Sequence, residues 1–225
     1  DTVRGIAIVM LVLFHVVGYG TTGLRLPDDH PVREFNGMLI YVRMPLFTIL
    51  SGYVYALRPF AGDVRRFVGG KARRLLIPLL VVGTLFALMQ SFTPGANGGL
   101  EGDEWLTIHI EPVAHFWFVE ALFWVFLVVM VLERLGWLDT VRGTAAVFVA
   151  AGLLSAVVQP PSTLGIEGAF YLLPFFVFGL AVKRFGMVGS KRTALFIGVP
   201  IMVVGLGYCF AGIFDVVGQS SRTSL

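Results

Sequence analysis

Arg4 and His15 are two ionisable residues that stand eleven positions apart in an apolar stretch at the start of the chain. An α-helix turns by about 100° per residue, so eleven steps come to about three turns plus 20° and place both residues on one face. With a rise of about 1.5 Å per residue, they lie about 16 Å apart along the axis. We therefore expect Arg4 near a membrane surface and His15 in the hydrocarbon region, where an ionisable side chain marks a pathway or a site.

His15 is the first candidate for chemistry. Burial in hydrocarbon favours the neutral form of the imidazole, which can accept a proton from a hydroxyl group. A lone histidine in a membrane helix can equally be a packing residue that is hydrogen-bonded to a neighbouring helix. Because Arg4 shares its face, we favour the functional interpretation and predict His15 and Arg4 as the catalytic pair.

A second group of candidates precedes the third apolar stretch. Lys71 and Arg74 stand three residues apart, and residues at this spacing share one face of a helix. Two cations held together at the mouth of a helix suit a phosphate-bearing ligand from the cytosol. The preference of cytoplasmic loops for Lys and Arg explains most of the charge in this region. We predict that Lys71, Arg73 and Arg74 form the phosphate-binding group.

Two charges of opposite sign form the third candidate. Arg43 lies in the second apolar stretch and Glu120 in the fourth. Each is about 10 Å below the outer surface by residue count. A buried arginine and a buried glutamate are each costly alone and tolerable as a pair. The two residues are therefore predicted as a pair that either ties two helices together or binds an acceptor.

The other reactive residues carry weaker signals. His109 and His115 lack the spacing of a metal site, so no metal is predicted. The single cysteine, Cys209, cannot form an intrachain disulfide, and we interpret it as a packing residue. An apolar run is interrupted by Ser51, Gly52 and Tyr53, and small residues in such a place more often permit close helix packing than catalysis.

The elements that must position these residues are membrane helices. Hydrophobic residues make up 56% of the chain and charged residues only 14%. Soluble domains have about 25% charged residues. The basic residues gather in short connections, so nucleic acid is not the predicted partner. We predict an all-α transmembrane bundle that forms one domain over residues 1–225. Seven apolar stretches are long enough to span the bilayer or nearly so: residues 3–20, 36–57, 74–92, 113–133, 141–158, 169–184 and 194–214.

The charges of the connections predict the orientation of the bundle. Residues 58–74 hold six Lys and Arg against one acid, and residues 183–192 hold four basic residues and no acid. Residues 93–112 hold four acids and no Lys or Arg. Because cytoplasmic loops are enriched in Lys and Arg, the amino end and the basic connections are expected in the cytoplasm.

At these residues the chain resembles the membrane acyltransferase-3 family of bacterial O-acyltransferases. Its opening helix, with Arg4 and His15, resembles the family signature of an arginine, ten residues and a histidine. The stretch RMPLFTILSGYVY resembles the second helix of the family, and KARRLLIP resembles its basic pair, here Lys71 and Arg74. The stretches HFWFVEALFWVF and YLLPFFVFG resemble later helices. Arg43 departs from the pattern, because members similar to sugar acetylases often carry histidine there.

The resemblance implies an acyltransferase of the bacterial inner membrane, of the class that transfers groups other than aminoacyl groups. It would move an acyl group, often acetyl, from cytosolic acyl-CoA to a hydroxyl of a glycan or glycolipid, with no covalently bound cofactor. Lys71, Arg74 and Arg4 would hold coenzyme A. His15 would either deprotonate the hydroxyl or be acylated first. The family bundle has about ten helices, so we expect the chain to lack the last few. Because the first residue is Asp1 and not Met, we expect it to be truncated at the amino end as well.

Two other functions fit parts of the sequence. A transporter or exporter of a polar solute could be lined by His15, Arg43 and Glu120, because membrane charges suit that class equally well. Against it, the two halves of the chain show no inverted repeat, and the basic pair would have no special role. A structural membrane protein without a ligand would leave the Arg4–His15 pair without an explanation.

Overall fold

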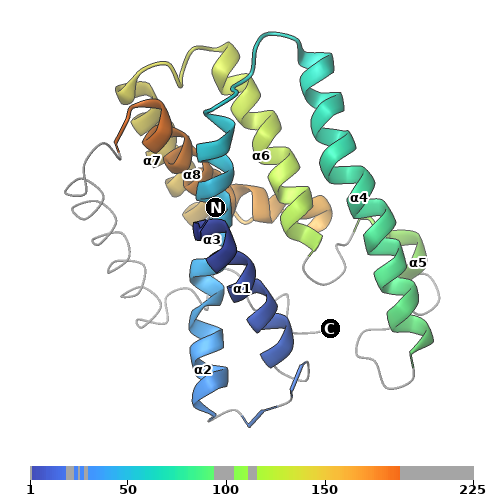
Figure 1. The fold of residues 1–225 in the computed structure, drawn as a ribbon. Helices are drawn as coiled ribbons and strands as arrows, with labels where there is room; N and C mark the ends of the chain where they lie inside the picture. Colours follow the sequence, from blue (N-terminus) through green and yellow to red (C-terminus); the bar gives the residue numbers. More distant parts are fainter. Residues whose placement is uncertain are drawn as a thin grey trace.

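In the computed structural model, the chain folds into a bundle of α-helices (Figure 1). The structure describes residues 2–18, 23, 24, 26, 27, 30–93, 104–110 and 116–187. Every regular element within these residues is helical, which confirms the predicted all-α class. A helix satisfies its own backbone hydrogen bonds, as a segment in lipid must.

The first three helices are α1 (Thr2–Val17), α2 (Pro31–Met38) and α3 (Ile40–Tyr55). At the start of α2, the His30 side chain accepts a hydrogen bond from the Val32 backbone N–H. Pro31 occupies the first turn, where its missing N–H removes no helical bond. Leu39 stands between α2 and α3 with helical backbone angles. The two helices therefore form one continuous segment of 25 residues, Pro31–Tyr55.

Helix α4 (Val64–Phe92) begins ten residues before position 74, where the apolar stretch predicts the span to start. Its amino terminus is capped by Asp63, whose side chain accepts a hydrogen bond from the Arg66 backbone N–H at 3.0 Å. Aspartate is a favoured residue at this position because it satisfies a free helical N–H. No proline interrupts the backbone between this cap and position 74. Of the six basic residues that the sequence places in this connection, five are therefore helical, and only Arg58 precedes the helix.

The second half of the bundle contains α6 (Trp117–Arg134), α7 (Val141–Val157) and α8 (Ile166–Arg184). These bounds agree within a few residues with the predicted stretches 113–133, 141–158 and 169–184. Thr140 caps α7 by accepting a hydrogen bond from the Gly143 backbone N–H at 3.1 Å. Two short elements, α5 (Glu104–Thr107) and the 3₁₀ turn η2 (Thr163–Gly165), complete the described part.

Helix α8 is the centre of the bundle and packs against α3, α6 and α7 (Figure 1). Its crossing with α3 is close because both helices present glycine. A Cβ atom at Gly52 would overlap the Phe176 carbonyl, and one at Gly179 would overlap the Ile49 carbonyl. Small residues allow membrane helices to approach in this way. The packing role predicted for Gly52 is therefore confirmed.

Aromatic rings fill the core on one side of α8. The ring of Phe176 lies 5.6 Å from that of Tyr55 on α3 and 5.1 Å from that of Phe126 on α6, centroid to centroid. These tilted and edge-to-face geometries are the favourable ones for aromatic pairs. The cluster ties α3, α6 and α8 together near the carboxyl end of α3.

Three helical segments within the described residues are long and apolar enough to cross a membrane: Pro31–Tyr55, Val64–Phe92 and Thr163–Arg184. Helices α1 and α7 have 16 and 17 residues, fewer than the roughly 20 that a span needs. The 18-residue helix α6 carries three charged residues, Glu120, Glu133 and Arg134. The predicted number of about seven spans is not confirmed, and the stretch 194–214 lies outside the described residues.

Candidate functional site

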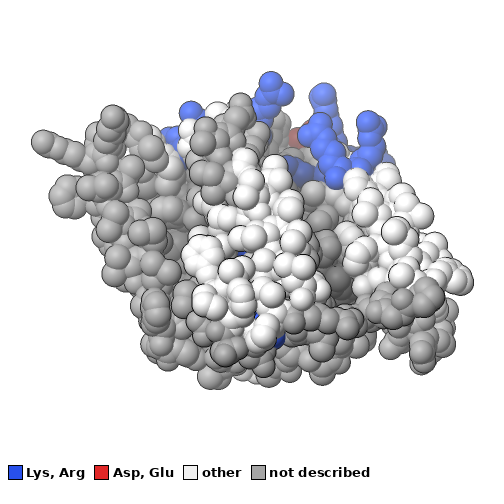
Figure 2. Space-filling view, turned by 60° about the horizontal axis from the view of Figure 1, so that its bottom comes forward, with Lys and Arg blue, Asp and Glu red and all other residues white. Residues whose placement is uncertain are grey.

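One end of the bundle collects the basic side chains. Helices α3, α6 and α8 end there, and α4 and α7 begin there (Figure 1). Figure 2 shows Lys and Arg side chains projecting along one edge of the molecule. We call this region the basic end. Its cations are Arg58, Arg65, Arg66, Lys71, Arg73, Arg74, Arg134, Arg142, Lys183 and Arg184.

Lys71 turns its ammonium group into the bundle. The Nζ atom lies 3.4 Å from the ring centroid of Phe126, 5.3 Å from that of Phe67 and 5.8 Å from that of Tyr55. The electron-rich faces of aromatic rings attract a cation at such distances. Lys71 forms no ion pair with any described residue. Aromatic rings, not a carboxylate, therefore surround this ammonium group.

Arg73 and Arg74 lie beside Lys71 on α4, and both side chains are exposed. Arg74 stands three residues after Lys71, so the two share one face of α4. Neither arginine forms an ion pair with a residue that the structure describes. The structure thus places all three predicted phosphate-binding residues in one cationic group at the start of α4.

The Arg184 guanidinium at the basic end has a different environment. Its Nη1 and Nη2 atoms both donate to the Glu133 carboxylate at the end of α6, and Nη1 also donates to the Leu138 carbonyl at 3.0 Å. A two-pronged contact of this kind is strong and geometrically specific. It ties the end of α8 to the end of α6, so Arg184 serves the architecture of this end.

A second set of polar residues lies inside the bundle. Arg43 on α3 is only 1% exposed and Asn36 on α2 is fully buried. The Arg43 Nη2 atom donates to the Asn36 Oδ1 atom at 3.4 Å, and the Asn36 Nδ2 atom donates to the Gly18 carbonyl at 3.2 Å. The Arg43 guanidinium carbon also lies 4.4 Å from the ring centroid of Phe14 on α1. Arg43 is therefore in contact with both α1 and α2.

Glu120 lies in the first turn of α6 and is 6% exposed. It packs beneath the turn that precedes α8, where a Cβ atom at Gly165 would lie 2.8 Å from the Glu120 Cβ atom. The Glu120 Oε2 atom and the Arg43 Nε atom are both buried without a hydrogen-bond partner among the described residues. We call Asn36, Arg43 and Glu120 the interior polar residues.

The direct ion pair predicted between Arg43 and Glu120 is not present among the described contacts. The Arg43 guanidinium faces Phe14 and Asn36, whereas the Cβ atom of Glu120 packs against the turn at Gly165 before α8. The two residues nevertheless share a depth. Arg43 lies about 18 Å from the carboxyl end of α3, and Glu120 lies about 21 Å from that of α6, at about 1.5 Å per residue.

Arg4 and His15, the predicted catalytic pair, belong to α1. Their side chains lie outside the described part of the structure, as do His115 and Cys209. His109 is described, and its Nε2 atom is hydrogen-bonded to the Thr84 hydroxyl on α4 at 3.1 Å. Within the described residues, no group of three or more His, Cys, Asp and Glu gathers in the manner of a metal site.

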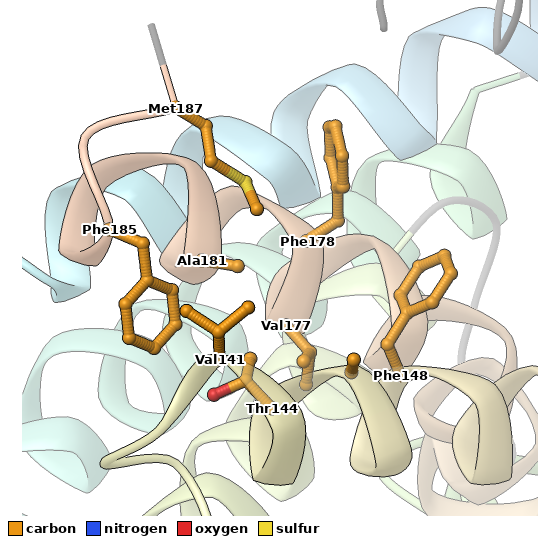
Figure 3. A pocket seen from close by; sticks show the side chains of 9 residues that line it. Val141, Thr144, Phe148, Val177, Phe178, Ala181, Phe185 and Met187 are labelled. Carbon is orange, nitrogen blue, oxygen red and sulfur yellow. The ribbon is translucent and has the colours of Figure 1, made fainter. Parts of the chain in front are cut away.

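A cavity of about 160 Å³ opens between α7 and α8 at the basic end. Figure 3 shows side chains around it from α7, from α8 and from the residues directly after α8, among them Phe148, Val177 and Phe185. The Thr144 hydroxyl is already engaged, because it donates to the Leu138 carbonyl at 3.2 Å. The cavity is therefore apolar, and none of the predicted site residues lines it.

Asn36 is a residue of this site that the sequence motifs did not mark. It stands seven positions before Arg43. Seven residues make two helical turns less about 20°, so both side chains lie on one face of the α2–α3 segment. The sequence signal that could have identified Asn36 is its spacing of seven residues from Arg43, which places it on the same helix face. Asn36 is easily passed over because it lies at the start of the predicted second stretch, where polar residues are ordinary.

Three comparisons with known proteins bear on this chain. A family model described as an acyltransferase domain, that of acyltransferase-3, matches residues 1–224. The chain is 27% identical over 221 residues to the nodulation protein NolL of Mesorhizobium japonicum, an alignment that covers 94% of the chain and 55% of that relative. The chain thus spans about half the length of this curated relative. No solved structure matches.

Proposed function

Because this chain belongs to the acyltransferase-3 family, we propose that it is an integral-membrane O-acyltransferase. It moves an acyl group, in the first instance acetyl, from cytosolic acyl-CoA to a hydroxyl of a cell-surface glycan or glycolipid. The observation that carries the proposal is the cationic group at the start of α4, where Lys71, Arg73 and Arg74 form no ion pair with a described residue. A donor rich in phosphate suits such a group.

The donor binds at the basic end in this proposal. The phosphates of coenzyme A rest on the exposed guanidinium groups of Arg73 and Arg74. Lys71 is reached next, because its ammonium group lies deeper, against Phe126. The pantetheine arm is long and uncharged, so it can carry the thioester from the basic end into the bundle towards α1.

His15 carries out the chemical step. As a neutral imidazole it removes the proton from the acceptor hydroxyl, whose oxygen then attacks the carbonyl carbon of the thioester. A C–O bond forms and the C–S bond breaks, so that the ester and the coenzyme A thiolate are released. The thiolate takes the proton back from His15 and leaves as the thiol. In the alternative order, His15 is acylated by the thioester first and passes the acyl group to the hydroxyl.

Arg43 and Glu120 bind the acceptor. The Arg43 Nε atom can donate a hydrogen bond and the Glu120 Oε2 atom can accept one, and both atoms are buried without a partner among the described residues. Leaving a charged group unsatisfied in this way costs about 1–3 kcal/mol or more. A polyhydroxyl acceptor that reaches this depth supplies the missing hydrogen bonds, so the arrangement favours a sugar over an apolar alcohol.

The orientation follows from the same assignment. Acyl-CoA is cytosolic, and short cytoplasmic loops are enriched in Lys and Arg, so the basic end faces the cytoplasm. The acceptor then enters from the opposite face, and the amino end of the chain is cytoplasmic. The membrane is the inner membrane of a bacterium.

The test compares the full-length protein with its His15→Ala variant at matched abundance in the membranes of a bacterial host. Base-labile acyl esters on surface glycans and glycolipids are measured by mass spectrometry, and the mass added per ester identifies the acyl group. We expect esters with the wild-type protein and none with His15→Ala. Equal ester content in the two strains would remove His15 from the mechanism. Esters in neither strain, with added sugar acceptors also unmodified, would reject the proposed activity.

A further inference from the structure

We propose that Asn36 is a positioning residue for the acyl-transfer reaction. Together with Arg43 it clamps α1 against the α2–α3 segment and thereby fixes the place of His15 in the bundle. The inference rests on the proposed function, because it assumes that His15 is the reacting group. It assigns a role to a residue that neither the motifs nor the family signature marks.

The clamp consists of two contacts with α1. The Asn36 Nδ2 atom donates to the Gly18 carbonyl at 3.2 Å, directly after the last turn of α1. The Arg43 guanidinium lies over the Phe14 ring at 4.4 Å. The two contacts are coupled to each other, because the Arg43 Nη2 atom donates to Asn36 Oδ1 at 3.4 Å.

The two contacts lie on either side of His15 in the sequence. Phe14 is the preceding residue, and Gly18 follows three residues later, which is about one helical turn. A helix that is held at one point on its side can still pivot about that point. A second attachment about one turn away opposes this movement, and so the two together determine where residue 15 stands relative to α3.

The packing of apolar side chains holds α1 less firmly than these two contacts do. Val17 alone is buried among the described hydrophobic side chains of α1, whereas Ile8, Val9, Val12 and Val16 are each more than half exposed. Over the described side chains of α1, dispersion contacts are therefore few. The polar contacts with Asn36 and Arg43 therefore carry a large share of the attachment.

The burial of Asn36 supports this role. Its amide group is 0% exposed and is satisfied at both ends, by a donor on one side and an acceptor on the other. An amide without its partners in such a place would carry a large desolvation penalty. Among apolar neighbours, the cluster is stable only in the arrangement that satisfies both groups, so the clamp specifies one orientation of α1.

The test uses isolated bacterial membranes that contain the full-length protein, with radiolabelled acetyl-CoA as donor and the endogenous lipid and glycan fraction as acceptor. Asn36→Leu keeps the number and branching of the side-chain heavy atoms and removes both hydrogen bonds. Thr48→Val is the matched control, because Thr48 on α3 is equally buried but its hydroxyl donates only to the Met44 carbonyl of its own helix. Both variants are compared at matched abundance and after a thermal-stability measurement in detergent.

We expect Asn36→Leu to lower the maximal transfer rate at least about 10-fold and to leave the KM for acetyl-CoA within about twofold, because a misplaced catalytic group affects the chemical step alone. Thr48→Val should keep the wild-type rate. Asn36→Asp, which retains the acceptor for Arg43 but loses the donor to Gly18, should fall between the two. It also serves as the test variant if Asn36→Leu does not accumulate.

The outcomes separate this inference from the proposed function. If His15→Ala is inactive while Asn36→Leu and Asn36→Asp transfer at the wild-type rate, the positioning role of Asn36 is overturned. The proposed acyltransferase activity then still stands. If Thr48→Val loses as much transfer activity as Asn36→Leu, the loss is a general result of changing a buried polar residue. The inference would then also fail. Full activity in His15→Ala would reject the premise itself.

Discussion

The basic end and the interior polar residues hold charges under opposite conditions. At the basic end, Arg73 and Arg74 are exposed, and Arg184 is paired with Glu133. In the interior, Arg43 and Glu120 are at most 6% exposed, and each leaves one atom without a hydrogen-bond partner among the described residues. A solvated charge is cheap, so its presence alone does not indicate a function. A buried and incompletely paired charge is costly, so it calls for a functional explanation.

Lys71 connects the basic end with the interior of the bundle. By sequence it is part of the basic loop, and by position its ammonium group lies among the rings of Tyr55, Phe67 and Phe126. Long basic side chains usually extend towards water from the end of a membrane helix. Lys71 does the reverse, which links the cationic surface to the interior. The comparison predicts that variants of interior charges impair transfer, whereas variants of exposed charges affect the binding of the donor.

The largest effect is expected in the interior. Arg43→Met and Glu120→Gln should each lower the maximal transfer rate about 100-fold without a change in the KM for acetyl-CoA, because each removes a buried charged contact to the acceptor, worth about 2–5 kcal/mol. Initial rates in membranes at matched abundance measure this. The exchange variant, Arg43→Glu with Glu120→Arg, should not restore transfer, because the two side chains form no ion pair. Restoration would show that they pair, and the acceptor role would be withdrawn.

The next effect concerns stability at the basic end. Arg184→Met removes the hydrogen bonds to the Glu133 carboxylate and the Leu138 carbonyl. Since hydrogen bonds to charged groups are among the stronger ones, we expect a loss of about 2 kcal/mol in the free energy of unfolding. Thermal unfolding of the purified protein in detergent measures it. Arg134→Ala, an exposed arginine at the same end, is the control and should change the midpoint little. Equal midpoints for the two variants would contradict the structural role of the pair.

A smaller effect is expected on the donor. Lys71→Ala combined with Arg74→Ala should raise the KM for acetyl-CoA about 10-fold and weaken its dependence on salt, since two charge-assisted contacts to phosphate are lost. Arg134→Ala combined with Arg142→Ala removes the same charge from another part of the basic end and should leave the KM unchanged. If both double variants raise the KM equally, the total positive charge of the basic end determines the KM. Lys71 and Arg74 would then serve only to orient the chain in the membrane.

The smallest effect is expected at the aromatic contact of Lys71. Phe126→Leu removes the nearest ring, and an interaction of this kind is worth about 0.5–1 kcal/mol. Since the donor reaches Lys71 in its inward position, loss of the ring that holds the ammonium group there should raise the KM for acetyl-CoA about threefold. Phe126→Tyr, which keeps the ring, is the control. A lowered KM in Phe126→Leu alone would mean that the ring holds Lys71 away from the donor.

Much of the fold could be predicted from the sequence. The sequence predicts the bounds of α7 and α8 within a few residues. The reason is that the bilayer sets the length of an apolar segment and the charges that flank it, and both can be read directly from the sequence. The start of α4 was misplaced, because its capping residue, Asp63, lies before the apolar stretch. The number of spans could not be settled in this way, since several helices are shorter or more polar than a standard span.

The sequence by itself determined the helical class, the gathering of Lys and Arg at one end and the burial of Arg43 and Glu120 at a common depth, because each follows from residue type and position along the chain. Only the tertiary structure decided which groups meet. It turned Lys71 onto Phe126, left Arg43 and Glu120 apart, and brought Asn36 to the end of α1. Such contacts depend on how the helices rotate and cross. That rotation is set by packing at sites such as Gly52 and Gly179, where α3 and α8 touch.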